Sequence, residues 1–274
     1  MTIKILIADK LAPEGATFLK AQKNVEVIEN TGLSGDALVT AIAEADGVIV
    51  RSSVKLTEEI LDKAFQNPEC RLKGIARAGV GVDNIDLQTA TKYGIAVMNS
   101  ASASTITTAE HAFALMISLA RNVANSNGVF RSGGWDRSKY VGVQLAGRTL
   151  GIVGMGRIGQ AVARRALAFG MDVIGFDPFM KEVTALDGQV RMMKSFNELI
   201  TAVDIVSFHV PRTEETDGML GAEQFAICKP DLLVVNAARG GIVNEEALIQ
   251  ALDKNQCGGA VVQHLRRSTP LQST

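Results

Sequence analysis

Short apolar runs alternate with helical patterns along almost the whole chain, and this alternation limits its possible folds more than any other feature. In the first hundred residues the apolar runs are Ile3–Ala8, Val25–Ile28, Gly47–Val50, Gly74–Ala78 and Ala96–Met98. Apolar residues at helical spacing lie between them, at Glu14–Ala21, Gly35–Glu44, Glu58–Phe65 and Ile85–Tyr93. Strands that alternate with helices predict a parallel sheet that is covered on both faces.

A long apolar helix separates this series from a second one. We expect the helix from about Thr107 to the region of Asn125, because Thr107 and Glu110 are spaced as in a capping box. Its apolar residues surround much of the helix, which predicts burial between layers or subunits. The second series has strands at Leu150–Val153, Val173–Phe176, Ile205–Phe208 and Leu232–Asn236, and helices at Arg157–Phe169, Ser195–Val203 and Glu245–Lys254. The sequence therefore predicts an α/β protein with two doubly wound, Rossmann-like parallel-sheet domains.

Composition and charge argue against several classes of protein. The 274 residues include 28 basic and 29 acidic side chains, and a net charge of −1 gives no electrostatic attraction to nucleic acid or anionic membranes. The longest apolar run, Ala112–Ala120, is much shorter than the roughly 20 residues of a bilayer span. Cys70, Cys228 and Cys257 are scattered, which predicts reduced thiols rather than disulfides or a zinc site. We therefore expect a cytoplasmic protein without a metal site, membrane segment or nucleic-acid partner.

A G-x-G-x-x-G motif opens the second series, with Gly154, Gly156, Arg157, Ile158 and Gly159. An apolar strand precedes it, a helical pattern follows it, and the next strand ends at Asp177, 18 residues after Gly159. This is the setting of a dinucleotide fingerprint, in which the glycines let a pyrophosphate approach a helix N-terminus. A carboxylate at the position of Asp177 accepts hydrogen bonds from the ribose of NAD. The motif predicts NAD as cofactor; the alternative is that Asp177 is only a turn residue before Pro178.

Four further segments carry a family resemblance. They are Ala78–Asp86 (AGVGVDNID), Thr108–His111 (TAEH), His209–Pro211 with Thr216, and Asn236–Val243 (NAARGGIV). With the glycine motif they resemble the D-isomer-specific 2-hydroxyacid dehydrogenases, over residues 1 to about 260. Two more segments, Ala8–Lys10 with Gly15 and Arg51–Thr57, resemble the branch of that family that oxidises a phosphorylated hydroxy acid.

The resemblance implies two domains that bind different ligands. Residues 1–98 would form a flavodoxin-like substrate-binding domain that lacks its C-terminal return segment. Residues 99–274 would form an incomplete NAD-binding domain, with the active site in the cleft between the two. The resemblance also implies a homodimer through the NAD-binding domain, in which Trp135-Asp136-Arg137 crosses to the partner subunit. The alternative is that Trp135 packs on its own domain.

Candidate site residues follow from the strand ends and from the resemblance. Arg239 comes after a predicted strand, where ligands of parallel sheets bind, and a guanidinium grips a carboxylate through two parallel N–H bonds. By resemblance Arg239 is the catalytic arginine that orients a small 2-hydroxy or 2-oxo acid and polarises its carbonyl. The resemblance assigns substrate binding to Arg51, Ser52, Gly79 and Val80, and the NAD cleft to Val80, His209, Val210, Pro211, Thr216, Ala237, Ala238 and Arg239. Ordinary loop or ion-pair roles are the alternative for these residues.

The histidines and the tail complete the expectations. His111 is expected in the core or at an interface, and His209 near the cofactor but not as the acid–base. After about residue 260 the family has an Asp, then a Glu beside a proline and a distant His, and the Glu and His form the proton relay. None has a counterpart in Val261–Thr274, and His264 is not expected to replace the base. We expect this tail to reflect a truncation, a frameshift or the boundary of a cloned segment, with NAD binding kept and turnover impaired.

Two other functions stay open at this point. One is a different D-2-hydroxyacid dehydrogenase, such as a glyoxylate or hydroxypyruvate reductase. The other is an NAD-binding protein without catalysis, because the same fold serves a family of transcriptional corepressors and fold alone does not decide function.

Overall fold

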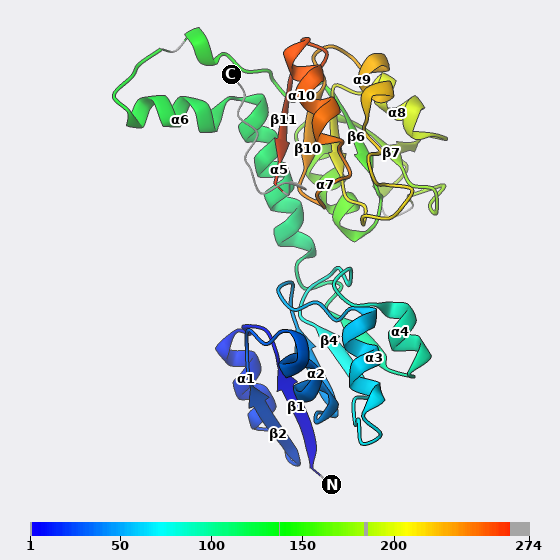
Figure 1. Ribbon diagram of the computed structural model, residues 1–274. Coiled ribbons are helices and arrows are strands. Elements are labelled where there is room, and N and C mark those ends of the chain that lie inside the picture. Colours follow the sequence, from blue (N-terminus) through cyan, green and yellow to red (C-terminus); the bar gives the residue numbers. More distant parts are fainter. Residues whose placement is uncertain (1, 137, 184–185, 264–274) are drawn as a thin grey trace. The chain divides into compact units, whose positions relative to one another are not determined.

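The computed structural model describes residues 2–136, 138–183 and 186–263, and it divides into two compact units between Ser104 and Thr105 (Figure 1). Arg137, His264 and the rest of the C-terminal tail lie outside the described residues.

Unit 1 contains a parallel sheet of five strands. Its elements are β1 (Ile3–Ile7), α1 (Pro13–Lys20), β2 (Val25–Glu29), α2 (Gly35–Ala43), β3 (Gly47–Val50), α3 (Glu58–Gln66), β4 (Gly74–Arg77), α4 (Leu87–Lys92) and β5 (Ala96–Asn99). The strand order is β2-β1-β3-β4-β5, and every adjacent pair is parallel. This is the flavodoxin-like order, in which ligands bind beyond the carboxyl ends of the strands.

Unit 2 contains a parallel sheet of six strands. Its elements are α5 (Thr105–Ala120), α6 (Val123–Arg131), the 3₁₀ turn η1 (Ser138–Tyr140), β6 (Thr149–Val153), α7 (Arg157–Ala168), β7 (Asp172–Phe176), β8 (Val190–Met192), α8 (Phe196–Ala202), β9 (Ile205–Phe208), α9 (Ala222–Ile227), β10 (Leu233–Asn236), α10 (Glu245–Asp253) and β11 (Gly259–Val262). The order β11-β10-β9-β6-β7-β8 is that of a Rossmann fold, with the topological switch point between β6 and β9. The prediction of two doubly wound parallel-sheet units is confirmed.

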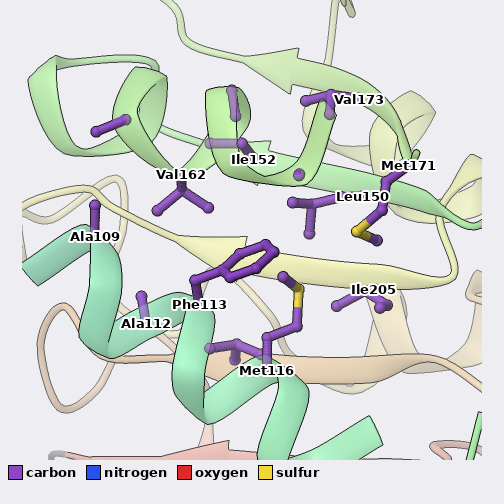
Figure 2. Close-up of a cluster of buried hydrophobic side chains, with 14 of the residues drawn as sticks. Ala109, Ala112, Phe113, Met116, Leu150, Ile152, Val162, Met171, Val173 and Ile205 are labelled. Atoms are coloured by element: carbon purple, nitrogen blue, oxygen red, sulfur yellow. The ribbon is translucent and has the colours of Figure 1, made fainter. Parts of the chain in front are cut away.

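Helices cover both faces of the unit 2 sheet. On one face, Phe113 and Met116 of α5 point toward Leu150 of β6 and Ile205 of β9, and α7 completes this cluster (Figure 2). The other face is covered by α8, α9 and α10, where Leu199 is fully buried. Burial of each such side chain contributes about 1.5–3 kcal/mol to the free energy of unfolding. The packed faces thereby hold the carboxyl ends of the strands in fixed positions.

Side-chain caps start four of the helices. Thr57 Oγ1 accepts from Ile60 N at the start of α3, and Asp86 Oδ1 accepts from Thr89 N at 2.8 Å at the start of α4. Ser195 caps α8 and Asn244 caps α10 in the same way. Each cap satisfies an N–H group that has no partner inside its helix.

The long helix expected after residue 107 is divided in two. α5 begins at Thr105, two residues earlier than the capping-box spacing suggests, and it ends at Ala120. Asn122 then takes a left-handed conformation (φ 52°) and α6 begins. A left-handed asparagine just after a helix is a common helix end, and the main-chain N–H of Val143 donates to the terminal carbonyl of α5, Ala120 O, at 2.8 Å. Two short elements, β8 and α9, were also not predicted, because periodicity is not readable over three to six residues.

Candidate functional site: a dinucleotide fold and two strand edges

The glycine motif forms a tight loop between β6 and α7. Gly154 takes φ +91°, which favours glycine, and its N–H donates to Phe176 O at 2.9 Å. A side chain at Gly159 would overlap Gly154 O, so α7 can approach β6 only because residue 159 lacks a Cβ. At Gly156 a Cβ would meet nothing within 4 Å, so this side of the loop is open. The loop is thus closed toward the protein and open where α7 begins.

Asp177 lies at the end of β7 beside this loop. Its Oδ2 accepts from Met155 N at 3.0 Å, and its Oδ1 accepts from Phe179 N at 2.9 Å. A carboxylate oxygen has two lone pairs, so both oxygens keep capacity for a further donor. The structure therefore brings the predicted ribose-binding carboxylate against the glycine loop.

A neutral histidine follows β9, the other strand of the switch point. A Cβ at Gly154 would lie 2.7 Å from His209 O and from Val210 Cγ1, so the β6 and β9 loops are in close contact. His209 Nε2 lies 2.9 Å from the Oγ of buried Ser207. Burial lowers the pKa of His209 to about 4, so its ring is neutral near pH 7. A neutral imidazole with this pKa is not suited to donate a proton near neutral pH.

Hydrogen bonds of its threonine residues hold the loop after β9 in shape. Thr216 Oγ1 donates to Pro211 O at 2.7 Å and accepts from Thr213 N at 2.8 Å. At its end Gly218 N donates to Gly241 O at 2.7 Å, which attaches this loop to the one that follows β10. Pro211 and Thr216 therefore lie on a loop that is tied to the Arg239 segment.

Arg239 lies in a turn that Asn236 organises. Asn236, at the end of β10, is completely buried; its Nδ2 donates to Arg239 O at 2.9 Å and its Oδ1 accepts from Ala238 N at 3.1 Å. Arg239 itself is partly buried, and its Nη1 donates to Ala238 O at 2.9 Å. The turn that contains Ala237, Ala238 and Arg239 is therefore fixed at the carboxyl edge of the unit 2 sheet.

In unit 1 the Arg51 loop is fixed by residues far away in the sequence. Buried Asp9 accepts from Arg51 N at 2.8 Å and from Val54 N at 3.1 Å. Burial raises the pKa of Asp9, but these main-chain hydrogen bonds outweigh it and leave the pKa below its ordinary value. Asn84 Nδ2 donates to the carbonyls of Arg51 and Val54 at 2.7 and 2.8 Å. Arg51 and Ser52 are exposed on this fixed loop.

The loop with Gly79 and Val80 follows β4 at the same edge of the unit 1 sheet. Ser100 N donates to Gly79 O at 3.0 Å, and Asn99 Nδ2 donates to Val80 O at 2.6 Å. Gly79 N donates to Arg77 O at 2.8 Å and is therefore occupied. Among the described residues, the N–H groups of Val80 and Gly81 donate to no acceptor. The main-chain donors available to an anion here are thus those of Val80 and Gly81 rather than that of Gly79.

The predicted residues thus gather at two strand edges, one in each unit. The glycine loop, Asp177, and the residues after β9 and β10 lie at the unit 2 edge; Arg51, Ser52, Gly79 and Val80 lie at the unit 1 edge. His111 is exposed on α5, so the expectation of a core position for it is wrong, because it lies on the side of the helix away from the buried Ala112 and Phe113.

Sequence reasoning missed the side chains that hold the loops. They are Asp9, Asn84 and Asn236, together with Gln160, whose Nε2 donates to Met155 O at 2.8 Å. Asn236 had a readable signal, since an asparagine that ends a strand often organises a turn.

The unit 2 edge fits a dinucleotide. The first turn of α7 leaves N–H groups without intrahelical acceptors, and the open face of Gly156 lets a pyrophosphate reach them. Asp177 accepts a hydrogen bond from Met155 N of this loop and has the strand-end position from which a carboxylate binds the ribose in such folds. The residues that would hold the cofactor are therefore Gly154, Gly156, Arg157, Ile158 and Gly159, with Asp177 at the ribose.

Fold and site together define a doubly wound dinucleotide-binding protein with a second, flavodoxin-like unit. Residues 113–272 match the family model described as "D-isomer specific 2-hydroxyacid dehydrogenase, NAD binding domain". The chain belongs to this family of D-isomer-specific 2-hydroxyacid dehydrogenases. NAD, predicted from the glycine motif and Asp177, is confirmed as the cofactor for which this family's domain is described. The match runs through residue 272, so it includes part of the segment after residue 260 that the sequence analysis sets apart.

Known relatives point to one branch of the family. The D-3-phosphoglycerate dehydrogenase of Methanocaldococcus jannaschii is 40% identical over 268 residues, which cover 98% of this chain and 50% of that protein. The enzyme of the same name from Bacillus subtilis is 40% identical over 271 residues, with the same coverage of 98% and 50%. The chain therefore spans about half the length of these curated relatives. Among solved structures, the TT0316 protein of Thermus thermophilus is similar with a TM-score of 0.85 and 34% identity, over 98% of this chain and 84% of that one.

The helices were also compared with the requirements of a membrane span. Within residues 2–136, 138–183 and 186–263, none is both long enough and apolar enough to cross a bilayer.

Proposed function

We propose that the protein oxidises D-3-phosphoglycerate to 3-phosphohydroxypyruvate in serine biosynthesis, with unit 1 as the substrate-binding part and unit 2 as the NAD-binding part. The overall reaction converts the C2 hydroxyl of the acid to a carbonyl and NAD to NADH, with release of one proton. The observation that carries the proposal is the Asn236 turn, which fixes Arg239 at the same sheet edge as the glycine loop. The 40% identity with D-3-phosphoglycerate dehydrogenases over 98% of the chain supports the choice of substrate.

Each group at these edges has a defined task in this proposal. Bound NAD supplies the acceptor for the hydride that leaves C2. Arg239 binds the carboxylate and polarises the C2 oxygen through its fork of N–H donors. Val80 and Gly81 offer main-chain N–H groups to an anionic oxygen of the substrate, and Arg51 adds a positive charge on its fixed loop.

A protein that binds NAD without turnover is the second candidate for this chain. His209 at the unit 2 edge favours it in one respect, because burial lowers the pKa of this histidine to about 4 and it is not suited to donate a proton near neutral pH. Loss of an acid–base group alone costs about 10²–10⁴-fold in rate.

The test combines an activity assay with a binding titration. Absorbance at the NADH band is followed with D-3-phosphoglycerate and NAD, and NADH binding is titrated on the same preparation. Turnover of D-3-phosphoglycerate in preference to D-glycerate and glycolate supports the proposed dehydrogenase, whereas NADH binding without turnover favours the second candidate. Absence of NADH binding would overturn both.

Arg239→Lys tests the assignment of the catalytic arginine in any active form. We expect turnover to fall by at least about tenfold, because one charged amine cannot reproduce a bidentate grip. NADH affinity, titrated on the same variant, separates a loss of cofactor binding from a loss of turnover. Unchanged turnover would refute the role of Arg239.

We also propose that the protein is a homodimer joined through the NAD-binding unit. The support is an apolar groove of about 470 Å³ along α6 and the segment after it. Phe130 and Trp135 border the groove with 63% and 75% of their surface exposed, and their rings meet edge to face at 6.1 Å. Large exposed apolar patches mark interaction surfaces. Sedimentation of the protein and of Trp135→Ser tests this, since a dimer should dissociate in the variant and a monomeric parent would contradict the proposal.

A further inference from the structure

Gln160 connects helix α7 to the glycine loop that precedes it. Its Nε2 donates to Met155 O at 2.8 Å, five positions earlier in the sequence. The same nitrogen lies 3.9 Å from Sδ of Met180, in the segment that follows Asp177. Side chains near the start of a helix lean toward its N-terminus, so a glutamine at this position can reach back to the loop. The glycine motif itself ends at Gly159 and does not specify residue 160.

Met155, the residue between the first two glycines of the motif, is held at its side chain and at both polar main-chain groups. Its N–H donates to Asp177 Oδ2 at 3.0 Å, and its side chain is completely buried. A Cβ at Gly175 of β7 would lie 2.8 Å from Met155 Cγ, so this side chain lies directly against β7. The Met155 carbonyl is held by Gln160. Removal of the Gln160 amide would therefore release this carbonyl alone.

The Met155 carbonyl shares a peptide plane with the N–H of Gly156. This peptide bond is trans, so the two groups point in opposite directions. The hydrogen bond from Gln160 to the oxygen therefore also sets the direction of the Gly156 N–H. Glycine accepts a wide range of backbone dihedral angles, so residue 156 does not by itself prevent the plane from turning. The Gln160 amide supplies the restraint that the glycine lacks.

The Gly156 N–H is available to a ligand. Within residues 2–136, 138–183 and 186–263 it donates to no acceptor, and Gly156 is exposed. The N–H groups of Arg157 and Ile158 follow in the first turn of α7, where a helix offers no internal acceptor. Successive main-chain N–H groups that point the same way bind phosphate oxygens. The orientation of the Met155–Gly156 peptide thus decides whether Gly156 belongs to this set of donors.

We propose that Gln160 is a positioning residue for the cofactor: by holding the Met155 carbonyl, it keeps the Gly156 N–H directed toward the pyrophosphate of NAD. Gln160 acts through the Met155–Gly156 peptide. A donor that is already oriented loses little freedom when the anion binds, so the hydrogen bond strengthens binding by preorganisation. The inference rests on the placement of the pyrophosphate at the glycine loop, which both candidate functions share.

The first experiment titrates NADH by calorimetry into the 274-residue chain and into the variants Gln160→Met and Gln22→Met. Methionine is similar to glutamine in length and in helix propensity, but it has no N–H donor. Gln22→Met is the matched control, because Gln22 Nε2 also donates to a main-chain carbonyl, Phe18 O at 3.0 Å, but in unit 1. We expect Gln160→Met to weaken NADH binding by about twofold to tenfold, the range for one neutral hydrogen bond. Gln22→Met should bind NADH as the parent does.

The second experiment observes the peptide itself. The main-chain amide signal of Gly156 is recorded by NMR with and without NADH, and the thermal midpoint is measured for each variant. In the parent we expect one signal that moves downfield with NADH, because the N–H gains a charged acceptor. In Gln160→Met without NADH the signal should be doubled or broadened, because the peptide samples two orientations. A purely structural role for Gln160 would lower the thermal midpoint and leave this signal single.

The outcomes separate this inference from the placement of the cofactor. Weaker NADH binding together with a doubled or broadened Gly156 signal supports the proposal. Parent-like NADH affinity in Gln160→Met, or a single Gly156 signal at the parent's position, overturns it and leaves the cofactor site unaffected. Gln160→Asn, whose amide is one methylene shorter, should show both effects and provides the test if Gln160→Met does not fold. A parent chain that binds no NADH overturns this inference together with both candidate functions.

Discussion

Gly156 and Gly159 belong to one motif, but the structure predicts different results when each is replaced by alanine. At Gly159 a Cβ would overlap Gly154 O and would lie 3.1 Å from the carbonyl carbon of the same residue. A main-chain oxygen cannot rotate away, so α7 must shift relative to β6. Strain from an extra methyl group in a packed interior costs about 1–3 kcal/mol, so Gly159→Ala should lower the free energy of unfolding by that amount.

Replacement of Gly156 by alanine should mainly affect cofactor binding. A Cβ there meets nothing within 4 Å, and φ is −67°, which alanine adopts without strain. Gly156 is the N-cap of α7, where glycine is preferred over alanine, so Gly156→Ala should lower the free energy of unfolding by no more than about 1 kcal/mol. If the pyrophosphate lies against this face, the new methyl group should cost about 1–3 kcal/mol of binding energy, which is roughly fivefold to 140-fold in the dissociation constant of NADH.

The assay is a pair of measurements on each variant: urea unfolding and NADH titration by calorimetry. Gly128→Ala is the control, because its Cβ also meets nothing within 4 Å and it lies in α6, away from the glycine loop. It should bind NADH as the parent does. Parent-like NADH affinity in Gly156→Ala would refute the placement of the pyrophosphate. A large loss of stability in Gly156→Ala would refute the description of that side of the loop as open.

Two further predictions concern carboxylates. Asp177→Ala should reduce the preference for NADH over NADPH by at least about tenfold, because it removes both the ribose acceptor and the negative charge that repels a 2′-phosphate. Parallel titrations with the two cofactors check this. An unchanged ratio of the two dissociation constants would contradict it. Asp9 has its pKa lowered in the folded state from the ordinary 3.8, so its stabilisation is present above that pH and is lost as the pH falls through the lower folded value. Asp9→Asn should therefore reduce stability by about 1–3 kcal/mol at pH 7, and the gap to the parent should narrow below about pH 4. Urea unfolding of the parent and of Asp9→Asn, at pH 7 and below about pH 4, measures this difference in stability. The same difference at both pH values would refute the stabilising role of the Asp9 carboxylate.

The sequence by itself determined the features that depend on neighbouring residues. Alternation of apolar runs and helical spacing is set by which side chains must leave water, so both parallel sheets could be predicted from it. The glycine motif could be recognised for the same reason, since the φ of +91° at Gly154 is a property of that one residue and favours glycine there. The separation of Gly159 and Asp177 in sequence then predicts a cofactor site at the end of β6.

Only the tertiary structure decided what depends on residues distant in sequence. The N–H of Val143 donates to Ala120 O at the end of α5, and no pattern within the helix predicts that contact. Asp9 fixes the Arg51 loop although it lies 42 positions away in the sequence. The hydrogen bonds that it accepts come from main-chain N–H groups, so no pattern of side chains in the loop could predict them. The resemblance assigns substrate binding to Gly79, and the structure shows that its main-chain N–H is bonded to Arg77 O. The guanidinium of Arg77 lies against this glycine, and a side chain's path through space is fixed by packing rather than by spacing along the chain.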